Sequence, residues 1–274
     1  MSKEIFSIWH CNDCTGRFTQ NIPAGDAIGP YYQSADYISH SDTKKGFINR
    51  VYHIVRNYTL QSKRKLIEKV AQKNNDLLLD VGAGTGAFAD TMQLAGWNVT
   101  GLEPDTVARE NALKNHGLVL QSLDALFTFS AKKFDIITMW HVLEHVHQLH
   151  NYIKTYHSIL KDDGTLIIAV PNYTSHDAAV YKEYWAAYDV PRHLYHFSPE
   201  SMQQLMQQHG FAVKEYKPMW FDSFYVSILS GQYKTGSGNL LKAMWNGFVS
   251  NLKAVSDAKK CSSVIYIIRK ENGK

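Results

Sequence analysis

A short apolar run followed directly by a glycine-rich turn constrains this chain more than any other feature of its sequence. Residues 77–81 read Leu-Leu-Leu-Asp-Val, and residues 82–86 read Gly-Ala-Gly-Thr-Gly. The run has the length and composition of a buried parallel strand. The glycines let the backbone turn sharply and approach a ligand, which then lies at the N-terminus of the next helix. The sequence therefore predicts a strand–turn–helix unit with a binding site at the turn.

Extended and helical patterns continue to alternate beyond this unit. We expect strands where short apolar runs end at turn residues, and helices where apolar residues recur at three- and four-residue intervals. The expected helices cover residues 86–96, 106–115, 147–160 and 198–210, and the expected strands cover 77–81, 98–102, 118–120, 134–139, 165–170, 211–216 and 263–268. This alternation predicts an α/β fold, in which helices cover both faces of a doubly wound parallel sheet.

The remaining segments are additions to this alternation. Residues 1–42 hold prolines, glycines and tyrosines in irregular order, which indicates a loop-rich N-terminal segment. We expect residues 43–274 to form the main domain, which begins with a helical lead-in over 43–73. A cap rich in histidine and aromatic residues over 172–197 and an insertion over 218–258 interrupt the alternation. A chain of 274 residues is long enough for one large core with such additions.

Composition narrows the classes of function. Hydrophobic residues make up 45% and charged residues 20% of the chain, as in ordinary globular proteins. Residues 1–10 lack the pattern of a secretory signal, and no apolar run approaches the ~18 residues that span a bilayer, so we expect a cytoplasmic protein without a membrane span. The net charge of +4 is scattered. Its densest cluster, residues 63–65, has helical spacing and indicates a solvated helix face, so we expect no nucleic-acid partner.

Cysteine usage points away from disulfides and metals. Cys11, Cys14 and Cys261 are too few for a disulfide framework, so we expect reduced thiols. Cys11 and Cys14 have the spacing of a zinc-binding pair. Tetrahedral zinc needs four ligands, however, and only His10 stands nearby, so we expect no metal site.

Two carboxylates accompany the glycine-rich turn. Glu103 lies at the end of the second expected strand, where a carboxylate can accept hydrogen bonds from both hydroxyls of a ribose. A glycine turn followed by such an acid is compatible with NAD or with S-adenosylmethionine. Asp80 favours S-adenosylmethionine, because a negative charge before the first glycine suits an ammonium or a sulfonium better than a diphosphate. The Gly-x-Gly-x-Gly spacing favours the same cofactor.

Three segments in register carry a family resemblance. Residues 77–105, 134–145 and 160–171 together resemble the class I S-adenosylmethionine-dependent methyltransferases. More narrowly, roughly residues 30–216 are similar to the bacterial group that includes the ubiquinone-biosynthesis O-methyltransferases. The resemblance implies a Rossmann-like sheet of seven strands in the order 3-2-1-4-5-7-6, with the last strand antiparallel. It also implies S-adenosyl-L-methionine as the cofactor and S-adenosyl-L-homocysteine as the product.

The resemblance further implies a role for each cofactor-binding residue. The glycine turn lines the methionine part, Asp80 binds its amino group, and Glu103 binds the ribose. The segment after the third strand contacts adenine, through Asp124 or through Ser122. Trp140 and His141 flank the methionine end. The complete implied set is Asp80, Gly82, Ala83, Gly84, Gly86, Glu103, Ser122, Leu123, Asp124, Trp140 and His141.

Histidines are the candidates for catalysis. Methyl transfer from a sulfonium is an in-line displacement, so a hydroxyl acceptor must be aligned and must lose a proton. The cap follows the fifth strand at the carboxyl edge of the sheet, where an acceptor would enter. We therefore predict that His193 or His196 positions or deprotonates the acceptor, with His141 as the third candidate. A hydrogen-bonding framework is the alternative for the two cap histidines, and no carboxylate or cysteine beside them has metal-binding spacing.

The sequence thus predicts methyl transfer to a hydroxyl of a small aromatic, quinone-like or sugar acceptor. Two alternatives stay open. One is an NAD-dependent oxidoreductase, which would need a proton donor such as a Tyr-x-x-x-Lys helix, and the pair Tyr181-Lys182 lacks that spacing. The other is a non-catalytic protein that binds S-adenosylmethionine. No pattern in the sequence sets the oligomeric state.

Overall fold

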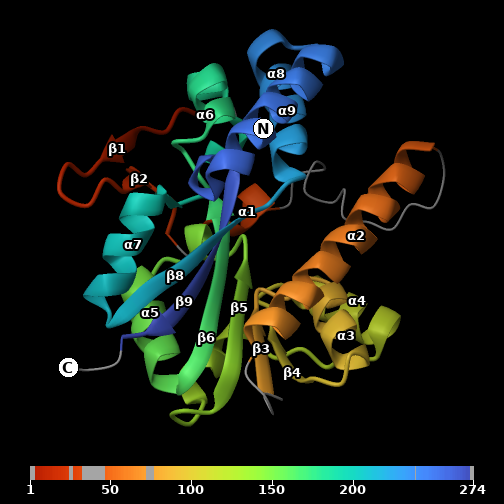
Figure 1. The fold of residues 1–274 in the computed structure, drawn as a ribbon, viewed down its shortest axis with the longest axis vertical. Helices are drawn as coiled ribbons and strands as arrows, with labels where there is room; N and C mark the ends of the chain where they lie inside the picture. Colours follow the sequence, from red (N-terminus) through yellow and green to blue (C-terminus); the bar gives the residue numbers. More distant parts are fainter. Residues whose placement is uncertain (1–3, 25–26, 33–46, 72–76, 238, 272–274) are drawn as a thin grey trace.

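The structure is a computed structural model that describes residues 4–24, 27–32, 47–71, 77–237 and 239–271. Its central sheet consists of β3 (Leu77–Val81), β4 (Asn98–Leu102), β5 (Phe134–Trp140), β6 (Leu160–Pro171), β8 (Phe211–Pro218) and β9 (Ser263–Lys270). These strands lie side by side in the order β4-β3-β5-β6-β9-β8. Figure 1 shows the sheet in the middle of the molecule, between two sets of helices.

The sheet is mostly parallel. Strands β4, β3, β5 and β6 run in the same direction, and β9 runs antiparallel to both β6 and β8. The predicted Rossmann-like sheet and its antiparallel last strand are thereby confirmed. The predicted strand over residues 118–120 is missing from the described sheet, where one isolated bridge joins Leu102 to Gln121. A single bridge forms no ladder, so the described sheet has six strands and the predicted order of seven is not confirmed.

Helices follow the strands as the sequence predicts. Ser198 begins one of them: its side chain accepts a hydrogen bond from the Ser201 backbone N–H at 3.0 Å, and Pro199 occupies the first turn. Asp105 caps another, whose end is marked by Gly117 at φ 68°. The helices of the two outer layers are α2 (Phe47–Val70), α3 (Ala87–Leu94), α4 (Thr106–His116), α5 (Leu149–Ile159) and α7 (Pro199–Gln208).

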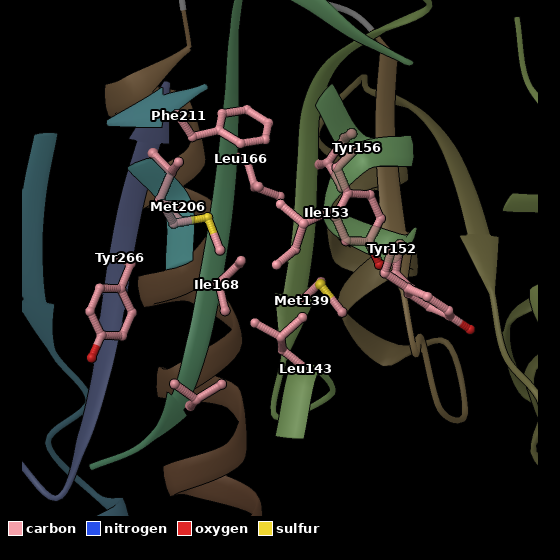
Figure 2. Packing of buried hydrophobic residues seen from close by; sticks show 14 of the residues in the cluster. Met139, Leu143, Tyr152, Ile153, Tyr156, Leu166, Ile168, Met206, Phe211 and Tyr266 are labelled. Atoms are coloured by element: carbon pink, nitrogen blue, oxygen red, sulfur yellow. The ribbon is translucent and has the colours of Figure 1, made fainter. Parts of the chain in front are cut away.

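The period-two pattern of the strands divides the core between the two faces of the sheet. Leu79, Ile137 and Ile168 belong to one buried cluster, together with residues of α5 and α7. Their neighbours in sequence belong to a second cluster, with residues of α2 and α3. Figure 2 shows the first cluster, in which side chains from the sheet meet those from α5 and α7: Met139, Leu143, Tyr152, Ile153, Tyr156, Leu166, Ile168, Met206, Phe211 and Tyr266.

The N-terminal segment and the cap contain more regular structure than predicted. Strands β1 (Ile8–His10) and β2 (Arg17–Thr19) pair with each other, and β2 pairs with β7 (Tyr195–His196) of the cap. This small sheet adds two short strands to the segment that the sequence predicts to be loop-rich. Short runs from different parts of the chain cannot be recognised as strands until they pair. The other short elements are α1 (Gly29–Tyr32), α6 (His176–Tyr181) and 3₁₀ turns over Leu123–Thr128, Leu143–His145, Lys182–Tyr184, Ala186–Tyr188 and Ala258–Lys260.

The insertion between β8 and β9 is a helical hairpin. It consists of α8 (Asp222–Thr235) and α9 (Leu240–Ser256), which pack against each other and against α6. Figure 1 shows α6, α8 and α9 gathered at one end of the molecule. Among the helices of the described ranges, none is long and apolar enough to cross a membrane. The division of the chain at residues 42 and 43 stays a prediction.

Candidate active site

The glycine turn lies directly after β3 and adopts a conformation that requires glycine. Gly82 has φ 72° and Gly84 has φ 55°, and side chains strain the backbone in this left-handed region. A Cβ atom on Gly82 would lie 2.3 Å from a methyl group of Val142. A Cβ atom on Gly84 would meet no heavy atom within 4 Å. The turn therefore packs tightly at its first glycine and borders open space at its second.

Glu103 links the end of β4 to this turn. One carboxylate oxygen accepts a hydrogen bond from the Gly84 N–H at 2.8 Å, and the other accepts one from the Asp105 N–H at 3.0 Å. Burial raises the pKa of Glu103, and these two hydrogen bonds oppose the rise. Each carboxylate oxygen has a second lone pair. Glu103 thus holds the turn in shape and retains acceptor capacity beside it.

Asp80 is a buried acid at this edge of the sheet, with 2% of its surface exposed. The Thr138 hydroxyl on β5 donates a hydrogen bond to its Oδ1 at 2.7 Å. Burial raises the pKa of Asp80 to about 7, and the Thr138 hydrogen bond and the charge of Lys63 limit the rise. A cation bound beside this buried carboxylate would favour its ionised form.

Lys63 of α2 joins the site, contrary to the expectation of a solvated helix face. Its ammonium lies 4.3 Å from the centroid of the Trp140 ring. Burial lowers the pKa of Lys63 to about 8, while the charges of Asp80 and Asp222 oppose the fall. The neighbouring Arg64 behaves as predicted and pairs with Glu68 at an exposed position, at 2.8 Å. The three basic residues were indistinguishable in sequence, because only the packing of α2 decides which one faces inward.

The segment expected to contact adenine lies next to Glu103. The Gln121 N–H donates to the Gly101 carbonyl at 3.0 Å, and the Glu103 N–H donates to the Gln121 carbonyl at 2.9 Å. Ser122 and Asp124, which follow directly, are exposed, and Leu123 between them is partly buried. This position suits the rim of a cofactor site. The choice between Ser122 and Asp124 stays a prediction.

His141 stands at the end of β5 in a network of charges. It has φ 58°, a conformation uncommon for a residue other than glycine and one often found at functional sites. Its Nε2 lies 2.9 Å from Oδ2 of Asp222, and its Nδ1 lies 3.3 Å from Oε1 of Glu144. Burial alone would lower the pKa of His141, but the charges and hydrogen bonds of Asp222 and Glu144 raise it to about 10. At neutral pH the ring is an imidazolium that donates from both nitrogens.

The two cap histidines lie in different surroundings. Nδ1 of His193 is 2.9 Å from the Ala187 carbonyl and must donate to it. The Thr19 hydroxyl donates to the His193 carbonyl at 2.7 Å and accepts from Nε2 of His196 at 3.1 Å. Burial lowers the pKa of His196 to about 3, so this ring is neutral. His196 thus joins the cap to β2, while Nε2 of His193 faces the carboxylate of Asp189 at 3.8 Å.

One group of side chains in the described ranges has the donors for a metal ion. Glu144, His145 and His193 each offer one ligand atom, and these atoms lie within 4.8 Å of one another. Nδ1 of His145 lies 3.0 Å from the Arg192 carbonyl, so both imidazoles are held through Nδ1 and can present Nε2. We name these three residues the histidine–carboxylate group. The spacing of residues in the sequence did not reveal this group, because Glu144 lies on the 3₁₀ turn that follows β5, far from His193 in the chain.

The fold and this site define an α/β enzyme domain that binds a nucleotide cofactor at a glycine turn. A model of the methyltransferase domain matches residues 53–216, which is more than half of the 274 residues. The chain therefore belongs to the S-adenosylmethionine-dependent methyltransferases of class I, and S-adenosylmethionine is its cofactor. Membership of this family decides against the NAD-dependent oxidoreductase.

Relatives of known name agree with this family. The ubiquinone biosynthesis O-methyltransferase of Actinobacillus pleuropneumoniae is 35% identical over 124 residues, which cover 39% of this chain and 53% of the relative. The protein of the same name from Rickettsia prowazekii is 27% identical over 205 residues, which cover 68% of this chain and 78% of the relative. The chain thus spans about half the length of the first relative.

Solved structures confirm the fold. The magnesium protoporphyrin IX methyltransferase of Synechocystis, solved with bound S-adenosylhomocysteine, has a TM-score of 0.57 at 14% identity, covering 89% of this chain and 98% of that one. An S-adenosylmethionine-dependent methyltransferase from Archaeoglobus fulgidus has a TM-score of 0.52 at 18% identity, covering 79% and 94%. At these identities the likeness concerns the fold alone.

Proposed function

We propose that this methyltransferase transfers the methyl group of S-adenosylmethionine to a hydroxyl of a small molecule with an aromatic, quinone-like or sugar skeleton. The observation that carries the cofactor part of the proposal is that the charges of Lys63 and Asp80 act on each other at the turn whose second glycine, Gly84, borders open space. The methionine part of the cofactor is a zwitterion with an ammonium and a carboxylate. A buried aspartate beside a lysine is complementary to both charges.

The cofactor roles follow from this complementarity. Asp80 accepts hydrogen bonds from the ammonium, and Lys63 pairs with the carboxylate. The remaining lone pairs of Glu103 accept the ribose hydroxyls, since its other lone pairs hold the backbone of the turn. Ser122, Leu123 and Asp124 border the adenine. When bound, the cofactor would supply an electrophilic methyl group on a sulfonium.

The acceptor side of the site lies beyond His141. Because His141 holds its proton between Asp222 and Glu144, we assign it to positioning these carboxylates and not to removing a proton. His193 is the stronger candidate for the base, because in its neutral form, with Nδ1 donating to the Ala187 carbonyl, Nε2 carries the lone pair. His196 is assigned to the framework of the cap through Thr19. The O-methyltransferase names of the relatives support a hydroxyl acceptor.

Substitution of Glu103 tests the cofactor site. We expect Glu103→Ala to weaken S-adenosylmethionine binding by about 10- to 150-fold, because hydrogen bonds to a charged group contribute about 1.5–3 kcal/mol. Isothermal titration calorimetry measures this change. Glu110→Ala, an exposed acid on α4, is the matched control and should bind normally. Equal affinity in both variants would remove Glu103 from the site.

A panel of acceptors tests the transfer itself. Release of S-adenosylhomocysteine would be followed with a catechol, a simple phenol, a sugar and a small carboxylate. Turnover with the catechol, the phenol or the sugar supports the proposal. Turnover with the carboxylate alone refutes a hydroxyl acceptor, and tight cofactor binding without turnover on any of them supports the non-catalytic alternative.

A further inference from the structure

Helix α9 has its large apolar side chains on the outside of the molecule. Its buried residues are small or polar: Ala243, Asn246, Gly247, Ser250 and Ala254. Its exposed residues include Leu241 at 82%, Trp245 at 64% and Val255 at 72% of their surface. Burial of apolar surface drives folding, so this arrangement is the reverse of an ordinary amphipathic helix.

The exposed residues form one continuous stripe. Successive members are three, one, three, four and three positions apart, which keeps them on one face of a helix. We name this set the outer stripe: Leu241, Met244, Trp245, Phe248, Leu252 and Val255. Close packing fixes the other face, since a Cβ atom on Gly247 would lie 2.7 Å from the ring of Phe224 on α8. The helix cannot rotate to bury the stripe against its own chain without losing this contact.

Within residues 223–256 the charged side chains are all lysines, and Asp222 and Asp257 flank this stretch. Residues 223–256 contain Lys234, Lys242 and Lys253 and have neither aspartate nor glutamate. All three lysines are exposed. Lys242 follows Leu241 and Lys253 follows Leu252 in sequence, so cations border the stripe near both ends. An apolar helix face bordered by lysines and carrying Trp, Phe and Leu is the pattern of a helix that lies in the surface of a membrane.

We propose that the outer stripe of α9 docks on an anionic phospholipid surface. The apolar side chains enter the boundary between headgroups and acyl chains, and the lysines pair with the anionic headgroups. The helix lies parallel to the membrane surface. Among the helices of the described ranges, none is able to span a bilayer. A second copy of this chain is a poorer occupant. In a two-fold interface the same patch meets itself, so the lysines of one copy would face those of the other.

The position of the stripe connects it to the site. The hairpin that carries α9 begins at Asp222, which contacts His141 at 2.9 Å. Figure 1 shows α8 and α9 together at the end of the molecule, beyond the sheet. A protein docked through α9 would bring this end close to the lipid, where an apolar acceptor dissolves. The docking itself is independent of methyl transfer and is tested without it.

Vesicle binding tests the proposal. The full chain would be mixed with vesicles of phosphatidylcholine alone and with vesicles containing roughly one-third phosphatidylglycerol, and bound protein measured by flotation. We expect binding to the anionic vesicles, and at least ~10-fold weaker partition for Trp245→Glu with Phe248→Glu. Leu94→Glu, which alters a residue 82% exposed on α3, is the matched control and should bind as the wild type does. A Lys234→Glu, Lys242→Glu variant should lose the preference for phosphatidylglycerol.

The melting temperature of each variant shows whether it folds. If the Trp245→Glu, Phe248→Glu variant does not fold, a Leu241→Glu, Leu252→Glu variant takes its place. Wild-type protein that ignores both kinds of vesicle overturns the proposal. So does equal binding by the stripe variants and the Leu94 control. A dimer in sedimentation that dissociates on substitution of the stripe, without vesicle binding, would identify a second copy as the occupant and refute the lipid surface.

Discussion

If Asp80 binds the cofactor as proposed, we expect cofactor affinity to depend on pH. In that role Asp80 must be ionised to bind the ammonium of S-adenosylmethionine, yet burial raises its pKa to about 7 in the free protein. Lowering the pH from 8 to 6 reduces the ionised fraction from about nine-tenths to about one-tenth. The dissociation constant should therefore rise by about tenfold, which corresponds to ~1.4 kcal/mol.

The charged groups that face Asp80 do not reverse this direction. Lys63 on α2, whose pKa is about 8, becomes more completely charged as the pH falls and would bind the cofactor carboxylate better. This effect reduces the pH dependence of the dissociation constant but does not reverse its direction. Glu103 contributes in the same direction as Asp80, since burial raises its pKa as well. The sign for stability is opposite: a raised pKa means that the folded chain holds the proton more tightly than the unfolded chain. Acidification to pH 6 therefore does not destabilise the fold through Asp80.

Calorimetric titration with S-adenosylmethionine at pH 6, 7 and 8 measures the effect, with Asp80→Asn as the comparison. The amide keeps the shape of the side chain and does not titrate, so the variant should bind about tenfold or more weakly at pH 8 and show a flat dependence below it. A melting curve at each pH confirms that both proteins are folded. Wild-type affinity that is constant from pH 8 to 6, or an Asn variant with the wild-type slope, would refute the assignment of Asp80.

Three further outcomes are expected. Gly82→Ala should lower the free energy of unfolding by about 2–4 kcal/mol in urea titrations, because Gly82 has φ 72° and an added Cβ atom would lie 2.3 Å from a valine methyl. The control Gly29→Ala, with open space around the added atom, should change the free energy of unfolding little. His193→Ala should lower turnover by about 10²- to 10⁴-fold at unchanged cofactor affinity, and His196→Ala should mainly lower the melting temperature. If both variants lose stability and neither loses turnover per folded molecule, the hypothesis of a histidine base is wrong. Dialysis against a chelator should leave turnover unchanged, and a loss restored by zinc would assign the histidine–carboxylate group to a metal.

The sequence by itself determined the strand–turn–helix unit and most of the sheet. Residues 77–86 specify that unit through apolar period and glycine placement, which act over a few neighbouring residues. The acid at the end of the second strand is fixed by the same local register, so Glu103 was identified as a candidate without tertiary information. The third strand was the local failure, because a three-residue run at a sheet edge pairs only where its neighbour allows it.

Tertiary structure decided the charges around the site. Lys63, Asp80 and Asp222 come from α2, β3 and α8, and their mutual interactions depend on how these elements pack. Nothing in the local sequence separates Lys63 from its basic neighbours or pairs His141 with a carboxylate 81 positions away. Electrostatic interactions and burial depend on distance in space, and the pKa values of Asp80 and His141 follow from both. The sequence therefore predicted where the cofactor site lies, whereas only the packing of distant elements decided which groups are charged there.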